Sequence, residues 1–315
     1  MKTSKTRLPD FLVIGAMKSA TTSLFEYLSL HPQISVSKIK EPNFFNKKEF
    51  FEGTWEKGIE WYMSLFKNNL KIKGEASNAY TKYPADPDVA ERIYSVLPKA
   101  KLIYVIRHPV ARAVSHYLHA LINGLERRTL KECLLKDINS NYINWGKYFL
   151  QLQQYLKYFD KKQIHVLTTE KLKTNRMETL KNIFVFLGVD SAFFTTKFTI
   201  EYNVTADKIW VLDCTNKMKL SEKPQQDAIA INPLQPDNNT EKRKTYVVGN
   251  RYYSQTVAQD VSSILNSKTN NIIAGLSEDE YMQLEHYFID DIKQLSSFLN
   301  YNFLEWNLSS PLRSD

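Results

Sequence analysis

The sequence contains only two cysteines, Cys133 and Cys214, and this scarcity excludes two classes of protein. A disulfide-stabilised scaffold and a cysteine-rich metal site both need more thiols than the chain has. Its 9 glycines and 11 prolines are also few for 315 residues, which excludes collagen-like and linker-dominated chains. Free thiols are typical of a reducing compartment, so we expect a cytoplasmic protein.

Long apolar runs are missing as well. The run at residues 11–14 ends at Gly15, far short of the roughly 20 apolar residues that a membrane helix needs. It is also shorter than the apolar core of a secretory signal peptide. We therefore expect no membrane segment and no secretion.

The residue types that are present balance as they do in a folded globular protein. Hydrophobic residues make up 43% of the chain and charged residues 24%, proportions that allow a core instead of a disordered chain. At about 100–200 residues per domain, the chain holds one large domain or two. We predict a single domain spanning residues 1–315.

The formal net charge is +8, from 42 Lys and Arg against 34 Asp and Glu. This excess favours an anionic partner without identifying it. The basic residues are scattered along the chain and form no single block, which favours a small, multiply anionic ligand over a nucleic acid. We expect a small-molecule partner and no nucleic-acid binding, and the sequence does not indicate an oligomeric state.

Short apolar strands alternate with amphipathic helices through the first two thirds of the chain. Buried strands are expected over 10–15, 71–75, 101–106 and 163–167. Helices are expected over 20–31, from Asp86-Pro87 to residue 97, and over 109–121, 146–159 and 177–187, the last ended by Gly188. The alternation predicts an α/β fold of three layers, in which a parallel β-sheet is flanked by helices.

The stretch 191–275 has a different composition. It is polar and Asn-rich, with short Pro-containing pieces. We expect an irregular cap on the substrate side, inserted within the single domain. Regular structure returns at Ser277-Glu-Asp-Glu280, a capping box that begins the last helix.

The segment from Gly15 to Ser23 follows the first strand and begins a helix, which makes it a candidate anion cradle. Small residues let the backbone wrap a tetrahedral anion, and a helix N-terminus offers N–H groups and the positive end of its dipole. Lys18 adds a cation, and Thr21, Thr22 and Ser23 add hydroxyl donors. The fold is therefore expected to be P-loop-like, although a Ser/Thr-rich helix cap beside a surface lysine would have a similar sequence.

The cradle lacks the spacing of a Walker nucleotide loop. Lys18 lies only three residues after Gly15, and the second glycine of that motif is missing. The strand over 101–106 is followed by Arg107 and His108, where a magnesium-binding carboxylate would be expected in a kinase. We predict a site for a phosphate-bearing ligand that requires no metal.

Arg107 ends the strand over 101–106, and Ser115 follows eight residues later on an early turn of the next helix. Ligands of α/β sheets bind at the carboxyl ends of the strands, so Arg107 should share an edge with the Lys18 loop. A guanidinium binds an anion through a forked pair of hydrogen bonds, to which Ser115 could add another. Arg112, on the same helix, is expected to be an exposed surface residue.

Three histidines follow Arg107, namely His108, His116 and His119. They have no accompanying Glu or Cys at ligand spacing, so a metal site is not predicted. We expect all three to be solvated on a polar helix face.

Three motifs in order resemble the sulfotransferase family, whose enzymes use 3′-phosphoadenosine-5′-phosphosulfate (PAPS). They are Gly-Ala-Met-Lys-Ser-Ala-Thr-Thr-Ser-Leu from residue 15, Lys-Glu-Pro-Asn-Phe-Phe at 40–45, and Leu-Ile-Tyr-Val-Ile-Arg-His-Pro-Val-Ala-Arg-Ala-Val-Ser at 102–115. The second motif is similar to that of the glycan-type and bacterial branch. The resemblance covers residues 10–190 and the last helix, and it does not cover 191–275.

The resemblance implies a role for each matching residue. Lys18 would contact the bridging and sulfuryl oxygens of PAPS and neutralise charge that grows on the leaving phosphate. The 5′-phosphate would lie in a cradle formed by Ser19, Ala20, Thr21, Thr22 and Ser23. Arg107 and Ser115 match the pair that binds the 3′-phosphate. Glu41 matches the carboxylate that removes the acceptor's proton as general base.

The chain departs from the family at several positions. Ala20 stands where glycine is common, and Ala76 stands where glycan enzymes often have lysine, which weighs against a polysaccharide acceptor. The family's third contact to the 3′-phosphate has several candidates here, namely 242–244 (Lys-Arg-Lys), 249–251 (Gly-Asn-Arg) and Lys268. Tyr148 is a candidate for the wall of the site.

We therefore predict a PAPS-dependent sulfotransferase that acts on a hydroxyl or nitrogen of a polar small molecule, such as a bacterial secondary metabolite, and releases 3′-phosphoadenosine-5′-phosphate (PAP). A glycan sulfotransferase is the first alternative. A kinase-like phosphotransferase would instead depend on magnesium. A basic nucleic-acid-binding protein would show steep salt dependence and no preference for PAP.

Overall fold

The computed structural model describes residues 8–66, 70–200, 202, 211–213, 218–219, 246–248, 251–253, 257, 261, 264 and 276–308. The chain divides into two units. The first unit comprises Met1–Arg112, Ile143–Asn203 and Phe288–Asp315, and the second comprises Ala113–Tyr142 and Val204–Tyr287.

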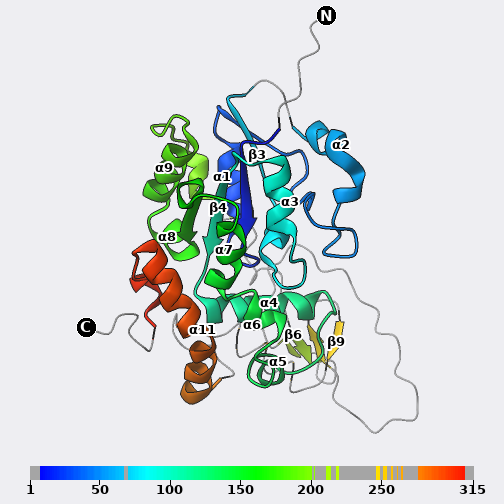
Figure 1. Ribbon diagram of the computed structural model, residues 1–315. Helices are drawn as coiled ribbons and strands as arrows, with labels where there is room; N and C mark the ends of the chain where they lie inside the picture. Colours follow the sequence, from blue (N-terminus) through cyan, green and yellow to red (C-terminus); the bar gives the residue numbers. More distant parts are fainter. Residues whose placement is uncertain are drawn as a thin grey trace, which may run out of the picture. The chain divides into compact units, whose positions relative to one another are not determined.

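A five-stranded parallel sheet forms the centre of the first unit (Figure 1). Its strands are β1 (Phe11–Gly15), β2 (Ile34–Val36), β3 (Ile72–Ala76), β4 (Lys101–Ile106) and β5 (Ile164–Thr168). They lie in the order β2-β3-β1-β4-β5, with Val13 of β1 opposite Ala76 of β3 and Ile103 of β4. The predicted parallel sheet is confirmed, and strand β2, which is only three residues long, was not predicted.

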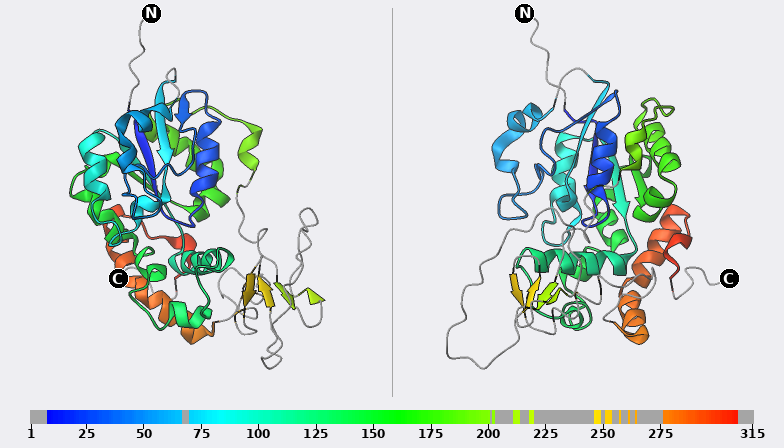
Figure 2. Two further views of the ribbon diagram at one scale, coloured as in Figure 1. Left: turned by 90° about the vertical axis from the view of Figure 1, so that its right-hand side faces the viewer. Right: turned by 180° about the vertical axis from the view of Figure 1, so that it is seen from behind.

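Helices flank this sheet. Those that lie wholly in the first unit are α1 (Thr21–Ser29), α2 (Gly58–Ser64), α3 (Val89–Val96), α7 (Tyr148–Leu156), α8 (Thr169–Thr174) and α9 (Arg176–Leu187). Short 3₁₀ turns are η1 (Trp55–Lys57), η2 (Asn78–Thr81), η3 (Lys161–Gln163), η4 (Thr196–Thr199) and η6 (Leu304–Trp306). Figure 2 shows α1 and α3 on opposite faces of the sheet, which is the three-layer arrangement that the sequence predicts.

Apolar side chains from the strands and from α1, α8 and α9 form one core beneath a single face of the sheet. Phe11 and Val13 of β1 pack there with Leu24 of α1 and Ile183 of α9, and each is at most 1% exposed. Burying a side chain of this size contributes about 1.5–3 kcal/mol relative to leaving it in water. This core fixes the direction in which β1 leads into α1.

Two helix boundaries show how local chemistry competes with tertiary contacts. Gly188 ends α9 in the left-handed conformation (φ 77°), as predicted. The predicted start of α3 at Asp86-Pro87, with Asp86 as the N-cap residue, is wrong, because the helix begins at Val89 with Asp88 as its N-cap residue. Asp86 is buried instead, where it pairs with Arg92 and accepts a hydrogen bond from Asn46 Nδ2 at 3.0 Å.

Helices α4 (Pro109–Ile122), α6 (Asn141–Asn144) and α11 (Glu278–Leu299) run across the division between the units, and α5 (Leu130–Leu134) belongs to the second. The apolar side chains of Val110, Val114, Tyr117 and Leu121 on α4 are buried. The predicted capping box of α11 is confirmed, because the Ser277 amide donates to Glu280 Oε2 at 2.8 Å and the Glu280 amide donates to Ser277 Oγ at 3.2 Å. The stretch that we expect to be irregular contains a four-stranded antiparallel sheet of the second unit. Its strands are β6 (Val211–Asp213), β7 (Met218–Lys219), β8 (Tyr246–Val248) and β9 (Arg251–Tyr253).

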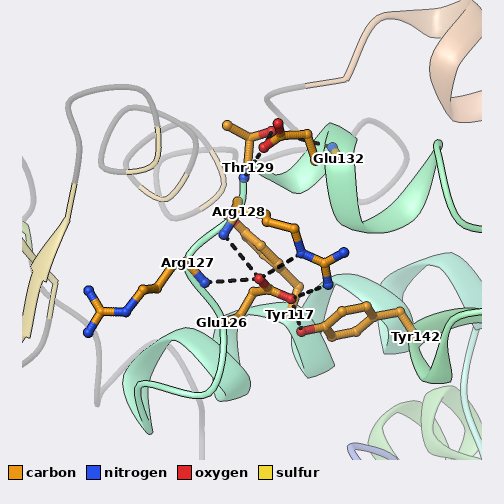
Figure 3. A network of polar contacts seen from close by, with 7 residues as sticks. All are labelled: Tyr117, Glu126, Arg127, Arg128, Thr129, Glu132 and Tyr142. Carbon is orange, nitrogen blue, oxygen red and sulfur yellow. Dashed lines mark hydrogen bonds and ion pairs between the residues drawn. The ribbon is translucent and has the colours of Figure 1, made fainter.

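One carboxylate organises the turn between α4 and α5 in the second unit. Glu126 accepts hydrogen bonds from the backbone N–H groups of Arg127 and Arg128, from the Arg128 guanidinium and from the Tyr142 hydroxyl (Figure 3). Burial would raise the pKa of Glu126, but the bonds from Arg128 and Arg127 outweigh it and hold the pKa well below its usual range. The capping box of Thr129 and Glu132 then begins α5.

Among the helices within the described ranges, none is both long and apolar enough to cross a bilayer.

Candidate functional site

The turn between β1 and α1 has the backbone geometry of an anion cradle. Lys18 (φ 67°) and Ala20 (φ 60°) both adopt the left-handed conformation, which is uncommon for residues other than glycine. Gly15 cannot be replaced without movement, because a Cβ at this position would lie 2.0 Å from Thr81 Oγ1. The turn is therefore tightly specified by its surroundings.

Helix α1 begins without a side-chain cap. Its N-cap residue is Ala20, which has no side-chain oxygen to accept from the helix N–H groups. The first N–H groups of a helix have no intrahelical partner, and the dipole places partial positive charge there. This end of α1 is suited to an anion.

The two serines of the turn differ in their partners. The Ser19 side chain is fully buried, and its Oγ has no hydrogen-bond partner among the residues that the structure describes. An orphaned buried hydroxyl costs free energy unless a ligand or water bonds to it, so Ser19 fits a phosphate oxygen. Ser23 Oγ donates instead to the Tyr202 carbonyl at 3.1 Å, so its hydroxyl proton is already used.

Arg107 lies at the end of β4, and the structure brings it to the same turn. Its Nη1 donates to the Lys18 carbonyl oxygen at 3.4 Å. Tyr148 fixes the Arg107 backbone, because its hydroxyl donates to the Arg107 carbonyl at 2.6 Å and lies 3.3 Å from the Arg107 amide nitrogen. Tyr148 is thus buried behind Arg107, and sequence reasoning did not find this role.

Burial and two neighbouring side chains act on the charge of the Arg107 guanidinium. Burial lowers the pKa of its guanidinium, and the nearby Glu170 carboxylate and Tyr148 oppose this. Glu170 is itself held in place, since it accepts from the His108 amide and from Trp306 Nε1, both at 3.0 Å. Guanidinium groups remain protonated even after a lowering, so Arg107 stays a cation.

The residues of α4 need two corrections. Arg112 is fully buried rather than exposed; burial lowers the pKa of its guanidinium, which the Tyr148 and Tyr104 hydroxyls oppose. His108 and His116 are also buried rather than solvated, because His108 packs against the Trp306 ring and His116 against the Tyr142 ring.

Ser115 is buried on α4 (7% exposed), in the second unit. Arg107 belongs to the first unit. That the two residues bind one phosphate stays a prediction.

Glu41 lies beside the carboxyl end of strand β3 and belongs to the first unit. Its amide N–H donates to the Ala76 carbonyl at 3.0 Å, so the chain at Glu41 continues alongside the end of β3. The carboxylate accepts from Asn78 Nδ2 at 2.7 Å and pairs with Lys40. The Glu41 side chain is 34% exposed, which leaves the carboxylate accessible.

Residues 8–244 match a family model described as a sulfotransferase domain, which is about three quarters of the chain. The chain belongs to the sulfotransferase family.

Its sequence relatives include enzymes whose names specify heparan sulfate. The bifunctional heparan sulfate N-deacetylase/N-sulfotransferase of Drosophila melanogaster is 29% identical over 210 residues, which are 58% of this chain and 20% of that protein. The heparan sulfate glucosamine 3-O-sulfotransferase 5 of Mus musculus is 31% identical over 212 residues, which are 63% and 58% of the two chains. The chain spans about a fifth of the length of the N-deacetylase/N-sulfotransferases that it matches.

A solved structure shares the fold over nearly the whole chain. The sulfotransferase from Alicyclobacillus acidocaldarius is 23% identical with a TM-score of 0.62, and the match covers 96% of this chain and 99% of the other. The sequence-based assignment to a P-loop-like sulfotransferase fold is therefore confirmed.

This sulfotransferase has a second cation near Glu41 that sequence reasoning missed. Lys82 Nζ lies over the rings of Phe51 and Trp145, 4.0 and 4.6 Å from their centroids. Burial lowers the pKa of Lys82 to about 8, while Glu41 opposes the lowering. A lysine with an aromatic wall and a lowered pKa is typical of functional sites, but its position in a turn gave no signal in the sequence.

Several predicted contacts of the sulfotransferase lie outside the described residues. These are the basic residues 242–244 and Lys268, together with Gly249 and Asn250. For Arg251 the structure gives the backbone, as the first residue of β9. Among the residues that are described, no group of three or more His, Cys, Asp or Glu is placed to hold a metal ion.

Proposed function

We propose that this protein is a PAPS-dependent sulfotransferase that acts on a hydroxyl or amino group of a carbohydrate. The observation that carries the proposal is the hydrogen bond from the Arg107 guanidinium to the backbone carbonyl of Lys18, which brings a cationic side chain from the carboxyl end of β4 to the turn that follows β1. PAPS supplies an activated sulfuryl group and has a phosphate on each side of its ribose. A site for it needs two cationic positions held at a fixed separation.

The turn and helix α1 would hold the 5′ end of the nucleotide. Lys18 supplies a cation, and Ser19 supplies a buried hydroxyl whose oxygen has no partner within the described part of the chain. These groups stabilise negative charge on a leaving phosphate, and they need no rearrangement because the turn is already fixed. Arg107 would bind the 3′-phosphate, for which its forked donors are suited.

Glu41 would accept the proton of the attacking hydroxyl or amino group. Asn78 orients its carboxylate by donating to Oε1, and Lys40 keeps cationic charge beside it. General-base assistance of this kind contributes about 10²–10⁴-fold in rate.

The acceptor class rests on the relatives, whose names specify heparan sulfate. They favour a carbohydrate over the secondary metabolite that the sequence analysis expects. Ala76, where glycan enzymes often have lysine, points the other way, but Lys82 provides a cation near Glu41. An acidic glycan is therefore compatible with the charge near Glu41.

Calorimetry with PAP tests the donor assignment. PAP should bind and stabilise the protein against heat, and adenosine 5′-monophosphate should bind much more weakly because it lacks the 3′-phosphate. Equal affinity for both, or binding of neither, would contradict the proposal. Lys18→Ala should bind PAP but lose most PAPS turnover, and turnover that requires magnesium would indicate a phosphotransferase instead.

A panel of acceptors tests the proposal that the acceptor is a carbohydrate. Radiolabelled PAPS is offered with desulfated heparan sulfate and, separately, with small alcohols, phenols and amines. Label that transfers only to the polysaccharide supports the proposal. Label that transfers only to small molecules would contradict it and would support a small-molecule acceptor instead.

A further inference from the structure

A buried carboxyl group lies behind the Glu41 segment, on strand β3. Glu75 is 1% exposed and accepts three hydrogen bonds. The hydroxyls of Tyr62 and Tyr80 donate to Oε1 at 3.3 and 2.7 Å, and Ser77 Oγ donates to Oε2 at 2.8 Å. All these residues belong to the first unit.

Two of the three hydroxyls also hold the backbone that follows Glu41. Ser77 Oγ accepts from the Asn43 amide at 3.0 Å, and the Tyr80 hydroxyl accepts from the Phe45 amide at 3.4 Å. Asn43 has a left-handed backbone (φ 48°), as does Glu41 (φ 57°), so this segment needs such bonds to keep its shape.

The side chain that holds the Glu41 carboxylate is anchored by the same group. Asn78 donates to Glu41 Oε1 and sits in η2 between Ser77 and Tyr80. Both of these neighbours bond to Glu75. The backbone after Glu41 and the partner of its carboxylate therefore depend on one buried residue.

We propose that Glu75 is a positioning residue, which sets the geometry of Glu41 for proton transfer through Ser77 and Tyr80. This inference rests on the proposed function, because it takes Glu41 as the proton acceptor.

The chemistry requires Glu75 to be ionised. A carboxylate only accepts hydrogen bonds, so each hydroxyl gives its single proton to it and keeps its oxygen free for a loop N–H. A protonated Glu75 would donate one bond, which turns a hydroxyl away. Ionisation of Glu75 thus orients the network.

Ionisation of Glu75 falls in the neutral range. Burial raises its pKa to about 7, against hydrogen bonds from Tyr80, Ser77 and Tyr62 that lower it, and the charge of Glu41 raises it further. Tyr155 on α7 also interacts electrostatically with Glu75. We therefore expect kcat to rise with pH through about 7.

Steady-state kinetics with PAPS and an acceptor test the proposal on variants of Glu75 and of the hydroxyl groups that bond to it. Glu75→Gln, Ser77→Ala and Tyr80→Phe should each lower kcat by about 10- to 100-fold, with the KM for PAPS unchanged. Tyr62→Phe is the control, since it removes a bond to Glu75 but none to the Glu41 segment. At a pH well above the rise, where Glu75 is ionised in both proteins, it should keep wild-type kcat. Ser77→Thr retains the hydroxyl and should restore kcat.

The dependence of kcat on pH distinguishes a positioning role of Glu75 from a contribution to stability alone. Glu75→Gln should lack the rise in kcat near pH 7 that wild type shows. Tyr62→Phe should keep the rise but shift it to higher pH, because the Tyr62 bond lowers the pKa of Glu75. A Glu75→Gln enzyme with wild-type kcat and profile would overturn the proposal. A loss of kcat in Tyr62→Phe as large as in Tyr80→Phe would overturn it too.

A measurement without turnover keeps this inference distinct from the proposed function. In protein labelled with ¹⁵N-Asn and ¹⁵N-Phe, the amide signals of Asn43 and Phe45 should titrate near neutral pH in wild type and not in Glu75→Gln. If they titrate but PAPS is never consumed, only the proposed function fails. If they do not titrate, the positioning role fails, whatever the turnover.

Discussion

The Arg107 guanidinium donates to the backbone carbonyl of Lys18, with 3.4 Å between Nη1 and the oxygen. The two residues are 89 positions apart in the sequence and meet because β1 and β4 are neighbours in the parallel sheet. A side chain thus braces the turn that would hold the other end of the nucleotide. Binding at the two ends should therefore be coupled.

Arg107→Ala is expected to weaken PAP binding by about 10- to 100-fold, because a hydrogen bond to a charged group contributes about 1.5–3 kcal/mol. Titration calorimetry measures the affinity. The control is Arg127→Ala, which removes an exposed arginine of the second unit and should leave the affinity unchanged. Wild-type affinity in Arg107→Ala would refute the 3′-phosphate assignment.

Glu41→Gln should retain PAP affinity and lose about 10²–10⁴-fold in kcat, since an amide cannot take the acceptor's proton. The amide oxygen can still accept from Asn78, so the loop should keep its shape. Single-turnover transfer of label from PAPS measures the effect. Normal turnover would assign the proton acceptor to another residue.

Glu126→Gln should reduce the free energy of unfolding by about 1–3 kcal/mol at neutral pH. The pKa of Glu126 is lower in the folded chain than its reference value of 4.5, so the stability it contributes is present above that pH and is lost as pH falls. Urea unfolding at several pH values should show the difference from wild type shrinking in acid. Glu49→Gln, at an exposed position, is the control, and a gap that stays constant in acid would contradict the assignment.

Asp291→Ala should destabilise the protein by about 1–2 kcal/mol. Its two carboxylate oxygens accept from the Phe149 and Leu150 amides, each at 2.8 Å, and so cap helix α7 from α11. Because α7 begins with Tyr148, which bonds to the Arg107 backbone, PAP affinity should also fall. Asp290→Ala removes the exposed neighbour and should change neither quantity.

Much of the central fold could be predicted from the sequence. Buried parallel strands are continuous apolar runs, and 101–106 and 10–15 have this pattern. Strand β2 is too short to give a signal, and β6–β9 lie in a polar stretch whose composition indicates no strand. Pairing with distant strands determines such segments, and one sequence does not show it.

Site residues that belong to a local sequence motif could be predicted. Site residues whose partners are distant in the sequence could not. The Lys18 turn and Arg107 could be found because each follows a strand directly. Glu75 was assigned no role because its partners Tyr62 and Tyr80 reach it only in the folded chain. Arg112 was misjudged because the general exposure of arginine does not account for the tyrosines around this one.

The contact of Gly15 with Thr81 has a consequence for substitutions at Gly15. Any side chain at Gly15 would push against Thr81, three residues beyond Asn78, the partner of Glu41. The turn that we propose for the nucleotide and the partner of the proposed proton acceptor therefore meet at η2. A substitution at Gly15 should therefore disturb both at once, because a Cβ there requires Thr81 to move.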